Sequence, residues 1–282
     1  MIDLHVHSTC SDGTLTPAGL VAHAAACHLS AFALTDHDTV FGLPEAFEAA
    51  RNFPVEVIAG IEFSTEYQGR DIHIVGLDFD WHDRHFCSEL ARFQNSRSER
   101  NRKMTEKLAD TGIAISPEQL KEQFGDAVLT RAHFARFLYE HGYVSSMSEA
   151  FTRYLDDHAP CFVPREKVTP EMAVRLIHQT GGIAVLAHPM QYHFSDTQLK
   201  ELIRALKVEG LNGIEAMYTT HSRSQEHRIR RLAQVMGICV SGGSDFHGSN
   251  KPGIDLGTGR GNLRIPDSTL ENLRKQRDKA NA

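Results

Sequence analysis

Two histidines near the start of the chain have the spacing of one strand face. Apolar and polar residues alternate from Ile2 to His7, so a short strand would place His5 and His7 on the same side. Two imidazoles at positions i and i+2 can converge on one divalent transition metal. Asp12 follows in a Ser/Gly turn that can fold back over the strand end. The pattern predicts part of a metal site, whose other ligands must come from elsewhere in the chain.

Further imidazoles and carboxylates fall at or just past the ends of other predicted strands. They are His37 in T-D-H-D, Glu62 after the strand 55–61, His73 in D-I-H-I, His188 in A-H-P, and Asp245 and His247 in S-D-F-H. Each of them alone has an ordinary explanation as a surface pair, a turn or a helix cap. Gathered in one place, they would be a costly polar cluster without cations to neutralise and orient them. The joint pattern therefore indicates a metal centre.

The elements that must position these residues form a β/α rhythm. Strands are expected at 2–6, 31–34, 55–61, 71–77, 183–186, 213–217 and 238–241, mostly separated by helices. This order is typical of a parallel α/β barrel, in which the strand ends surround one mouth and build the active site. The link between strands 55–61 and 71–77 is too short for a helix, so we expect a hairpin there.

A long middle region interrupts the rhythm. Residues 83–109 are expected to form one highly charged helix, and 116–165 hold short helical patterns without a convincing strand. We therefore assign 1–98 and 166–282 to the barrel and 99–165 to a helical insertion subdomain that covers the active site. On the long helix, an exposed face is expected to carry Arg97, Arg100, Arg102 and Lys103.

The composition of the chain limits the kinds of molecule that it is expected to bind and the environment in which it is expected to work. The 282 residues carry a net charge of −6, which argues against non-specific binding to duplex DNA but not against a small phosphorylated ligand in a local basic pocket. The five scattered cysteines form no C-x-x-C pair, which fits reduced thiols in the cytoplasm. There is no secretion signal and no apolar run of membrane length, so no membrane association is expected. The 17 histidines again point to metals.

Six segments of the chain resemble the successive motifs of the polymerase and histidinol phosphatase (PHP) family of the amidohydrolase superfamily. They are H-V-H-S-T-C-S-D-G-T-L-T-P, A-L-T-D-H-D-T-V-F-G, I-A-G-I-E-F-S-T, D-I-H-I-V-G, A-V-L-A-H-P and G-G-S-D-F-H, which span residues 3 to about 250 apart from the insertion. The resemblance implies a distorted (β/α)7 barrel that holds two or three divalent ions, foremost Mn²⁺, with Fe²⁺ or Zn²⁺ as alternatives. The ligands it implies are His5, His7, Asp12, His37, Glu62, His73, His188, Asp245 and His247.

The same resemblance implies a phosphoesterase chemistry with two catalytic carboxylates. Glu62 would bridge two ions, and Asp245 would orient the attacking hydroxide or accept its proton. Paired cations polarise a phosphoryl oxygen and acidify a shared water, which is the chemistry that phosphate-ester hydrolysis needs. No G-x-S-x-G elbow, P-loop or G-x-G-x-x-G competes with this interpretation.

The insertion offers groups for a second phosphate. Arg131 and His133 lie in T-R-A-H at an expected helix start, where backbone N–H groups and a guanidinium suit an anion, although a solvated helix face is an equal alternative. His221, after the sixth strand, is a third candidate for substrate contact. Within the family, the chain resembles the bacterial ribonuclease AM-like subgroup. That resemblance implies removal of the 3′-phosphate of adenosine 3′,5′-bisphosphate to give AMP, and 5′-to-3′ exonuclease action on short RNA.

Three other functions stay open. One is a histidinol-phosphatase-like phosphomonoesterase with the same metals and another pocket. Another is a 3′-to-5′ exonuclease module that works with a DNA polymerase, and the third is a non-catalytic metal-binding scaffold. Release of inorganic phosphate with manganese, and its loss with a chelator, would separate an enzyme from a scaffold.

Overall fold

The computed structural model describes residues 1–156, 159–164 and 168–280. Its centre is one seven-stranded sheet in which strands adjacent in the sequence are adjacent in the sheet. The strands are β1 (Ile2–Val6), β2 (Ala31–Leu34), β3 (Glu56–Tyr67), β4 (Arg70–Leu77), β5 (Ile183–Leu186), β6 (Leu211–Tyr218) and β7 (Cys239–Gly243). A parallel bridge between Val6 and Phe246 brings the two edges together, so the sheet is a nearly closed barrel.

The barrel is distorted because β4 runs against both of its neighbours. The pairs among β1, β2 and β3 and among β5, β6 and β7 are parallel, whereas β4 is antiparallel to β3 and to β5. The predicted distorted (β/α)7 barrel is therefore confirmed, and so is the hairpin. One boundary differs: β3 was expected to end before Glu62 but continues to Tyr67, because its ladder with β4 extends to the turn at Gln68 and Gly69.

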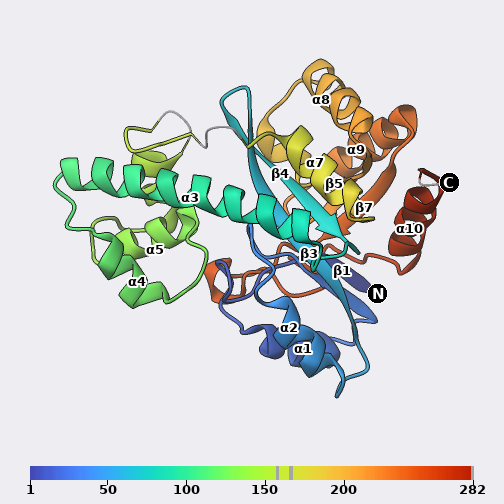
Figure 1. Cartoon of the computed structure of the whole chain (residues 1–282), viewed down its shortest axis with the longest axis horizontal. Helices are drawn as coiled ribbons and strands as arrows, with labels where there is room; N and C mark the ends of the chain where they lie inside the picture. Colours follow the sequence, from blue (N-terminus) through green and yellow to red (C-terminus); the bar gives the residue numbers. More distant parts are fainter. Residues whose placement is uncertain (157–158, 165–167, 281–282) are drawn as a thin grey trace.

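Helices cover the barrel and build the insertion (Figure 1). They are α1 (Pro17–Ala26), α2 (Leu43–Ala50), α3 (Arg84–Asp110), α4 (Pro117–Phe124), α5 (Arg131–Glu140), α6 (Met147–Ala150), α7 (Pro170–Gln179), α8 (Asp196–Val208), α9 (Arg223–Met236) and α10 (Ser268–Ala280). Short helical turns lie at Phe151–Leu155, Pro189–Tyr192 and Gly248–Asn250. Side-chain oxygens cap the starts of several helices, as Thr16 does for α1 and Asp83 for α3, because the first N–H groups of a helix need acceptors.

Helix α3 joins two hydrophobic cores. Near its start, Phe86 and Phe93 pack with residues of β3, β4 and α7 on the outside of the barrel. Near its end, Met104 and Leu108 pack in a separate core with residues of α4 and α5. Figure 1 shows α3 extending from the barrel into the insertion.

The helical insertion thus has a core of its own, and no strand occurs among its described residues. The boundary proposed between 98 and 99 lies inside α3, and the boundary between 165 and 166 lies outside the described residues. Across the described residues, no helix is both long and apolar enough to span a membrane.

Candidate metal centre

Glu62 lies at the middle of a cluster of imidazoles. Its Oε1 is 3.2 Å from His5 Nε2, 2.8 Å from His73 Nδ1 and 3.1 Å from His188 Nε2. Its Oε2 is 3.3 Å from His7 Nε2 and 3.0 Å from His37 Nδ1. The two oxygens of one buried carboxylate therefore face different sets of histidines, which is the arrangement that a bridging ligand needs.

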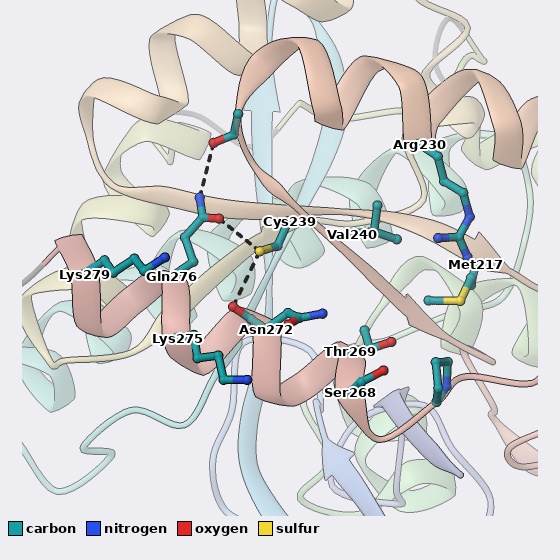
Figure 2. Close-up of a pocket in the computed structure, with 12 residues that line it drawn as sticks. Met217, Arg230, Cys239, Val240, Ser268, Thr269, Asn272, Lys275, Gln276 and Lys279 are labelled. Carbon is teal, nitrogen blue, oxygen red and sulfur yellow. Dashed lines mark hydrogen bonds between the residues drawn. The ribbon is translucent and has the colours of Figure 1, made fainter.

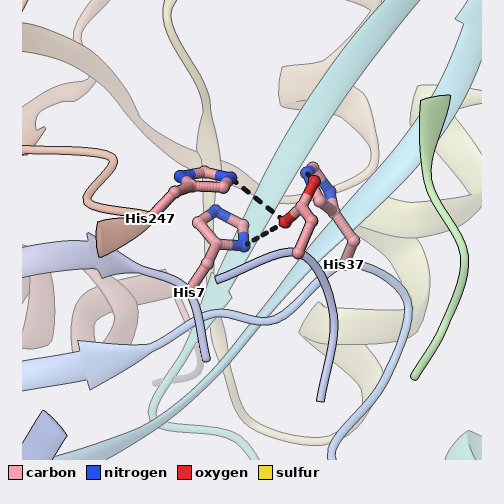
Figure 3. Close-up of side chains that lie close together, drawn as sticks. His7, His37 and His247 are labelled. Atoms are coloured by element: carbon pink, nitrogen blue, oxygen red, sulfur yellow. Dashed lines mark ion pairs between the residues drawn. The ribbon is translucent and has the colours of Figure 1, made fainter. Parts of the chain in front are cut away.

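Asp12 lies close to a second group of imidazoles, those of His7, His37 and His247, which Figure 3 labels. Its Oδ1 is 3.1 Å from His247 Nε2, and its Oδ2 is 3.7 Å from His37 Nε2. The rings of His7 and His247 are stacked, with centroids 4.1 Å apart. The turn after β1 thus returns Asp12 to the strand end, as its sequence predicted.

The two carboxylate oxygens of Asp245 have different neighbours: one faces the imidazoles, and the other accepts a hydrogen bond. Its Oδ1 lies 3.4 Å from His7 Nε2 and 3.7 Å from His5 Nε2. Its Oδ2 accepts a 2.6 Å hydrogen bond from the hydroxyl of Tyr218. The hydroxyl of Tyr218 thus holds Asp245 in place.

The donor atoms fit divalent metal ions. Three overlapping groups have ligand atoms within 4.8 Å of one another: His7, Asp12, His37 and His247; His5, His7 and Asp245; and His37, Glu62 and His73. Nε2 of His5 and of His7 are buried and form no hydrogen bond within the described structure, although carboxylate oxygens lie close by. Nitrogen and oxygen donors in such a mixture suit manganese, iron or zinc. The residues present therefore fit the ions that the sequence implied.

A second layer of carboxylates, which was not predicted from the sequence, supports the imidazoles and the turn that carries Asp12. Glu215, buried on β6, lies 3.2 Å from Nδ1 of His5 and accepts a hydrogen bond from the backbone N–H of His188. Asp36 accepts hydrogen bonds from the hydroxyls of Ser8 and Ser11, which fixes the turn that carries Asp12. Carboxylates of this kind orient metal-binding histidines. The alternation of β6 could have indicated that Glu215 points inward, but no motif marks it.

The cluster is strongly coupled electrostatically. Burial alone would lower the pKa of His5, but the carboxylates of Glu62, Glu215 and Asp245 raise it well above its usual value. Burial likewise opposes the charge on His7, yet its contacts with Asp245 and Glu62 raise its pKa to about 9. Burial would raise the pKa of Glu62, but His5 and its neighbouring imidazoles hold it well below its usual range. Without metal, protonation of His5 and His7 would offset part of the negative charge of these carboxylates.

Two predicted ligands have an unusual backbone. His188 has a φ of 23° and Asp245 a φ of 57°, a region that side-chain-bearing residues rarely adopt. Such strain is concentrated at functional sites. Close packing adds a constraint at Gly243, where a Cβ would lie 2.2 Å from that of His5. The residue before Ser244 must therefore be glycine for β1 and β7 to meet.

A pocket of about 340 Å³ opens onto the cluster and carries several cations. Asp12, His37, His73 and His247 line it together with Arg97, Arg100, Arg131 and Lys251. Arg131 forms a 2.6 Å ion pair with Asp71 there. A neighbouring hollow of about 400 Å³ is lined in part by the same Asp71, His73 and Arg131.

The prediction that Arg97 and Arg100 lie on an exposed face was wrong. Both side chains are buried, and Arg97 contacts the barrel as well as the insertion carbonyl of Leu129, whereas Arg102 is exposed. Arg97 donates to Asp38 and to the Ser64 hydroxyl.

Two of the three predicted substrate-binding residues do not line the pocket. His133 is buried, and its Nδ1 accepts the backbone N–H of Thr130 in a capping box at the start of α5. Burial lowers its pKa to about 4, so the ring is neutral. His221 is also buried, donates from Nδ1 to the carbonyl of Ala216, and lies beside Tyr218. Arg131 is the predicted substrate residue that the structure brings to the metal cluster.

A larger hollow of about 810 Å³ lies between α9, β7 and α10 (Figure 2). Its lining includes Arg230, Lys275 and Lys279 around Cys239, whose thiol hydrogen bonds to Gln276. The described residues that line it include no histidine or carboxylate, and none of them lines the pocket above the imidazoles. The metal centre is therefore not located there.

Comparison with known families agrees with this geometry. The model of the PHP domain family matches residues 3–235, which include all the predicted ligands except Asp245 and His247. The chain belongs to the PHP domain family.

Curated relatives of this PHP domain protein are similar over nearly their whole length. A 5′-3′ exoribonuclease from Haemophilus influenzae is 39% identical over 87% of this chain and 89% of its own. A 3′,5′-nucleoside bisphosphate phosphatase from Chromobacterium violaceum is 36% identical over 91% of this chain and 90% of its own. The Escherichia coli 5′-3′ exoribonuclease Rnm is 36% identical over 90% and 87% of the two chains.

Solved structures share the PHP fold throughout. An amidohydrolase from Chromobacterium violaceum, solved with bound sulfate and no metal, superposes with a TM-score of 0.87 at 34% identity, covering 98% of this chain and 96% of its own. A protein from Bifidobacterium adolescentis, assigned as a metal-dependent phosphoesterase, superposes with a TM-score of 0.85 at 27% identity and the same coverage.

Proposed function

We propose that this chain is a metal-dependent phosphoesterase that removes the 3′-phosphate of nucleoside 3′,5′-bisphosphates. Adenosine 3′,5′-bisphosphate would yield AMP and inorganic phosphate, and short RNA would be a second substrate, degraded from its 5′ end. The proposed cofactors are two or three divalent ions, foremost Mn²⁺, held by the nine ligands named from the sequence.

One observation carries the proposal: a single pocket joins the imidazole and carboxylate cluster to several cationic side chains. His37, His73 and His247 line one part of it, and Arg131 lines the same pocket. A substrate with two phosphates needs both a centre that activates one and a separate group that recognises the other. Arginine suits the second task because its planar guanidinium binds phosphate oxygens in pairs.

The chain's own residues have distinct roles in this reaction. When bound, the divalent ions would polarise the phosphoryl group and acidify the attacking water. Asp245 has Oδ1 toward the imidazoles and Oδ2 hydrogen-bonded to Tyr218, which supports the proposal that Oδ1 would accept the proton of that water. Glu62 holds five imidazoles in place through its two oxygens. Arg131, already paired with Asp71, would bind the phosphate that is retained.

The proposal for RNA rests on the neighbouring hollow and on the relatives. The pocket and the hollow of about 400 Å³ meet at Asp71, His73 and Arg131, so the space beside the cluster exceeds what a single phosphate needs. Two of the similar proteins are 5′-3′ exoribonucleases and one is a bisphosphate phosphatase. The same retained-phosphate site would serve a mononucleotide and the 5′ end of an oligonucleotide.

A substrate comparison tests the proposal. Adenosine 3′,5′-bisphosphate, histidinol phosphate and a short 5′-phosphorylated RNA would be assayed for hydrolysis with manganese and with a chelator. We expect turnover of the bisphosphate and the RNA and little of histidinol phosphate, with all activity lost on chelation. Turnover of histidinol phosphate alone would favour the alternative phosphomonoesterase.

The Arg131→Ala variant tests the second phosphate site within the same assay. We expect selective loss of bisphosphate and RNA turnover, whereas equal losses on every substrate would refute the assignment. Arg102→Ala is a control, because Arg102 is an exposed arginine of the insertion that pairs with Glu99 and Glu106 and does not line the pocket.

A further inference from the structure

Lys251 is a cationic residue of the pocket that was not predicted from any sequence motif. Its ammonium group lies against Asp245 Oδ2, while its side chain is 38% exposed and lines the pocket. It follows the turn Gly248–Asn250, which is tied to the cluster because Asn250 donates a 2.7 Å hydrogen bond to the carbonyl of Asp12. The position of Lys251 is therefore fixed by the same loops that carry predicted ligands.

Lys251 differs from two other cations of the pocket in the partner that balances it. Arg97 pairs with Asp38 and Arg131 with Asp71, and neither carboxylate is a candidate metal ligand. Among the described residues, Lys251 has Asp245 as its only ion-pair partner, and Asp245 belongs to a candidate ligand group. One carboxylate must therefore balance both a lysine and bound ions.

Loading the site with divalent ions makes this position of Lys251 electrostatically unfavourable. Like charges at close range repel, most strongly where water is largely excluded. An anion that carries two negative charges would offset the repulsion by sitting between the lysine and the ions. A phosphoryl group has this charge and presents several oxygens that accept charge-assisted hydrogen bonds.

We propose that Lys251 is a catalytic residue that binds the non-bridging oxygens of the phosphoryl group being transferred. This inference rests on the proposed phosphoesterase function and adds a contact to the reacting group. Water oxygen would form the new bond to phosphorus as its proton passes to Asp245, the bond to the 3′-oxygen would break, and that oxygen would take up the proton from Asp245. Lys251 keeps its own proton, since a lysine normally has a pKa near 10.4, and contributes charge alone.

The test compares Lys251→Met and Lys251→Arg with the wild-type protein, with Lys275→Met as a control in the hollow between α9 and α10. Binding of inorganic phosphate to the manganese-loaded proteins would be measured by calorimetry, together with manganese per chain, kcat and KM. We expect Lys251→Met to bind phosphate about 10- to 100-fold more weakly, because a charge-assisted hydrogen bond is lost. Manganese content should be unchanged, Lys251→Arg should keep most of the affinity, and Lys275→Met should behave as wild type.

Several outcomes would overturn the assignment. Phosphate affinity within twofold of wild type in Lys251→Met would do so, as would a wild-type protein that binds no phosphate. Loss of manganese from Lys251→Met would show instead that the lysine acts through Asp245. If the wild-type protein hydrolyses no bisphosphate or RNA, the proposed function fails, but the phosphate calorimetry still decides the role of Lys251.

Discussion

Glu62 is the single residue that most of the imidazoles share. It is buried on β3, and its two oxygens contact five histidines from four different segments. Because β3 and β4 continue as a ladder beyond it, Glu62 is held by strand pairing on both sides of its position. A carboxylate held in this way keeps its geometry when the surrounding loops move.

Replacing Glu62 with Gln should therefore remove bound metal without changing side-chain volume. We expect loss of at least one manganese per chain and a fall in activity of at least about 100-fold, since loss of even a supporting carboxylate costs 10- to 100-fold. Metal content and kcat would be measured in parallel. Glu66→Gln, on the same strand but outside the cluster, is the matched control, and full manganese content in Glu62→Gln would contradict the bridging role.

Proton competition at His7 should make metal affinity depend on pH. Without metal, its pKa of about 9 keeps His7 protonated at neutral pH, whereas burial lowers the pKa of His37, His188 and His247. A ligand imidazole must be neutral, so each manganese bound at His7 displaces a proton. Affinity should rise as pH increases from 6.5 to 9, by up to about tenfold per pH unit for each proton displaced.

The folding stability of the metal-free protein should change with pH in the opposite direction to the metal affinity, falling as pH rises. The His7 pKa is raised on folding, so its contribution to the free energy of unfolding is fully present below about pH 6.5 and is lost as pH rises through about 9.

The proton competition at His7 can be measured directly. Calorimetric titration of manganese at pH 6.5, 7.5 and 8.5, in buffers of different ionisation enthalpy, would count the protons released. An affinity that stays constant over this range would rule out the competition.

At the scale of elements, the insertion reaches the metal centre through the start of α5. The Thr130 hydroxyl donates a 2.8 Å hydrogen bond to Asp12 Oδ2, across the boundary between insertion and barrel. Both side chains are buried, so the bond is shielded from water. A predicted ligand on the turn after β1 is thus oriented by a helix more than a hundred residues away in the chain.

Thr130→Val should weaken manganese binding at the group that contains Asp12. The substitution keeps the shape of the side chain but removes the donor, and we expect an affinity about 10-fold lower, in line with other outer hydrogen bonds at metal sites. Titration of manganese into the metal-free protein would measure it. Thr130→Ser should restore the affinity, and equal binding by Val and Ser variants would show that the hydroxyl has no effect.

For the whole molecule, the metal ions should act as part of the folded structure. The predicted ligands from β1, β2, β3, β4, β5 and β7 and their loops meet at one point, and unfolding separates them. An ion at 100 times its dissociation constant adds about 2.7 kcal/mol per site to the free energy of unfolding. For a chain of this size that corresponds to roughly 5 °C in Tm.

Thermal unfolding with and without a chelator would test this. We expect the chelated protein to melt at lower temperature and added manganese to restore the Tm, with a smaller recovery in Glu62→Gln. A Tm unaffected by chelation would mean that metal binds the unfolded chain equally well or not at all.

The sequence allowed the barrel, its hairpin and the convergence of distant motifs to be predicted, because strand ends of a barrel must meet. It did not reveal the burial of Arg97 and Arg100, since a highly charged helix looks solvated until its neighbours in the barrel and the insertion are placed. Glu215 and Lys251 stayed hidden for a related reason. A strand-interior carboxylate and a loop lysine acquire a role only from neighbours that are far away in the chain.

The uninterrupted course of α3 restricts how substrates can enter. Its first half packs in the barrel core and its second half in the insertion core, so one continuous helix crosses the junction. A lid that swings open needs a hinge, and a continuous helix at the junction provides none. Access of substrates to the pocket should therefore depend on rotation of single side chains and small loop shifts at the pocket mouth. This favours compact or single-stranded substrates over bulky ones.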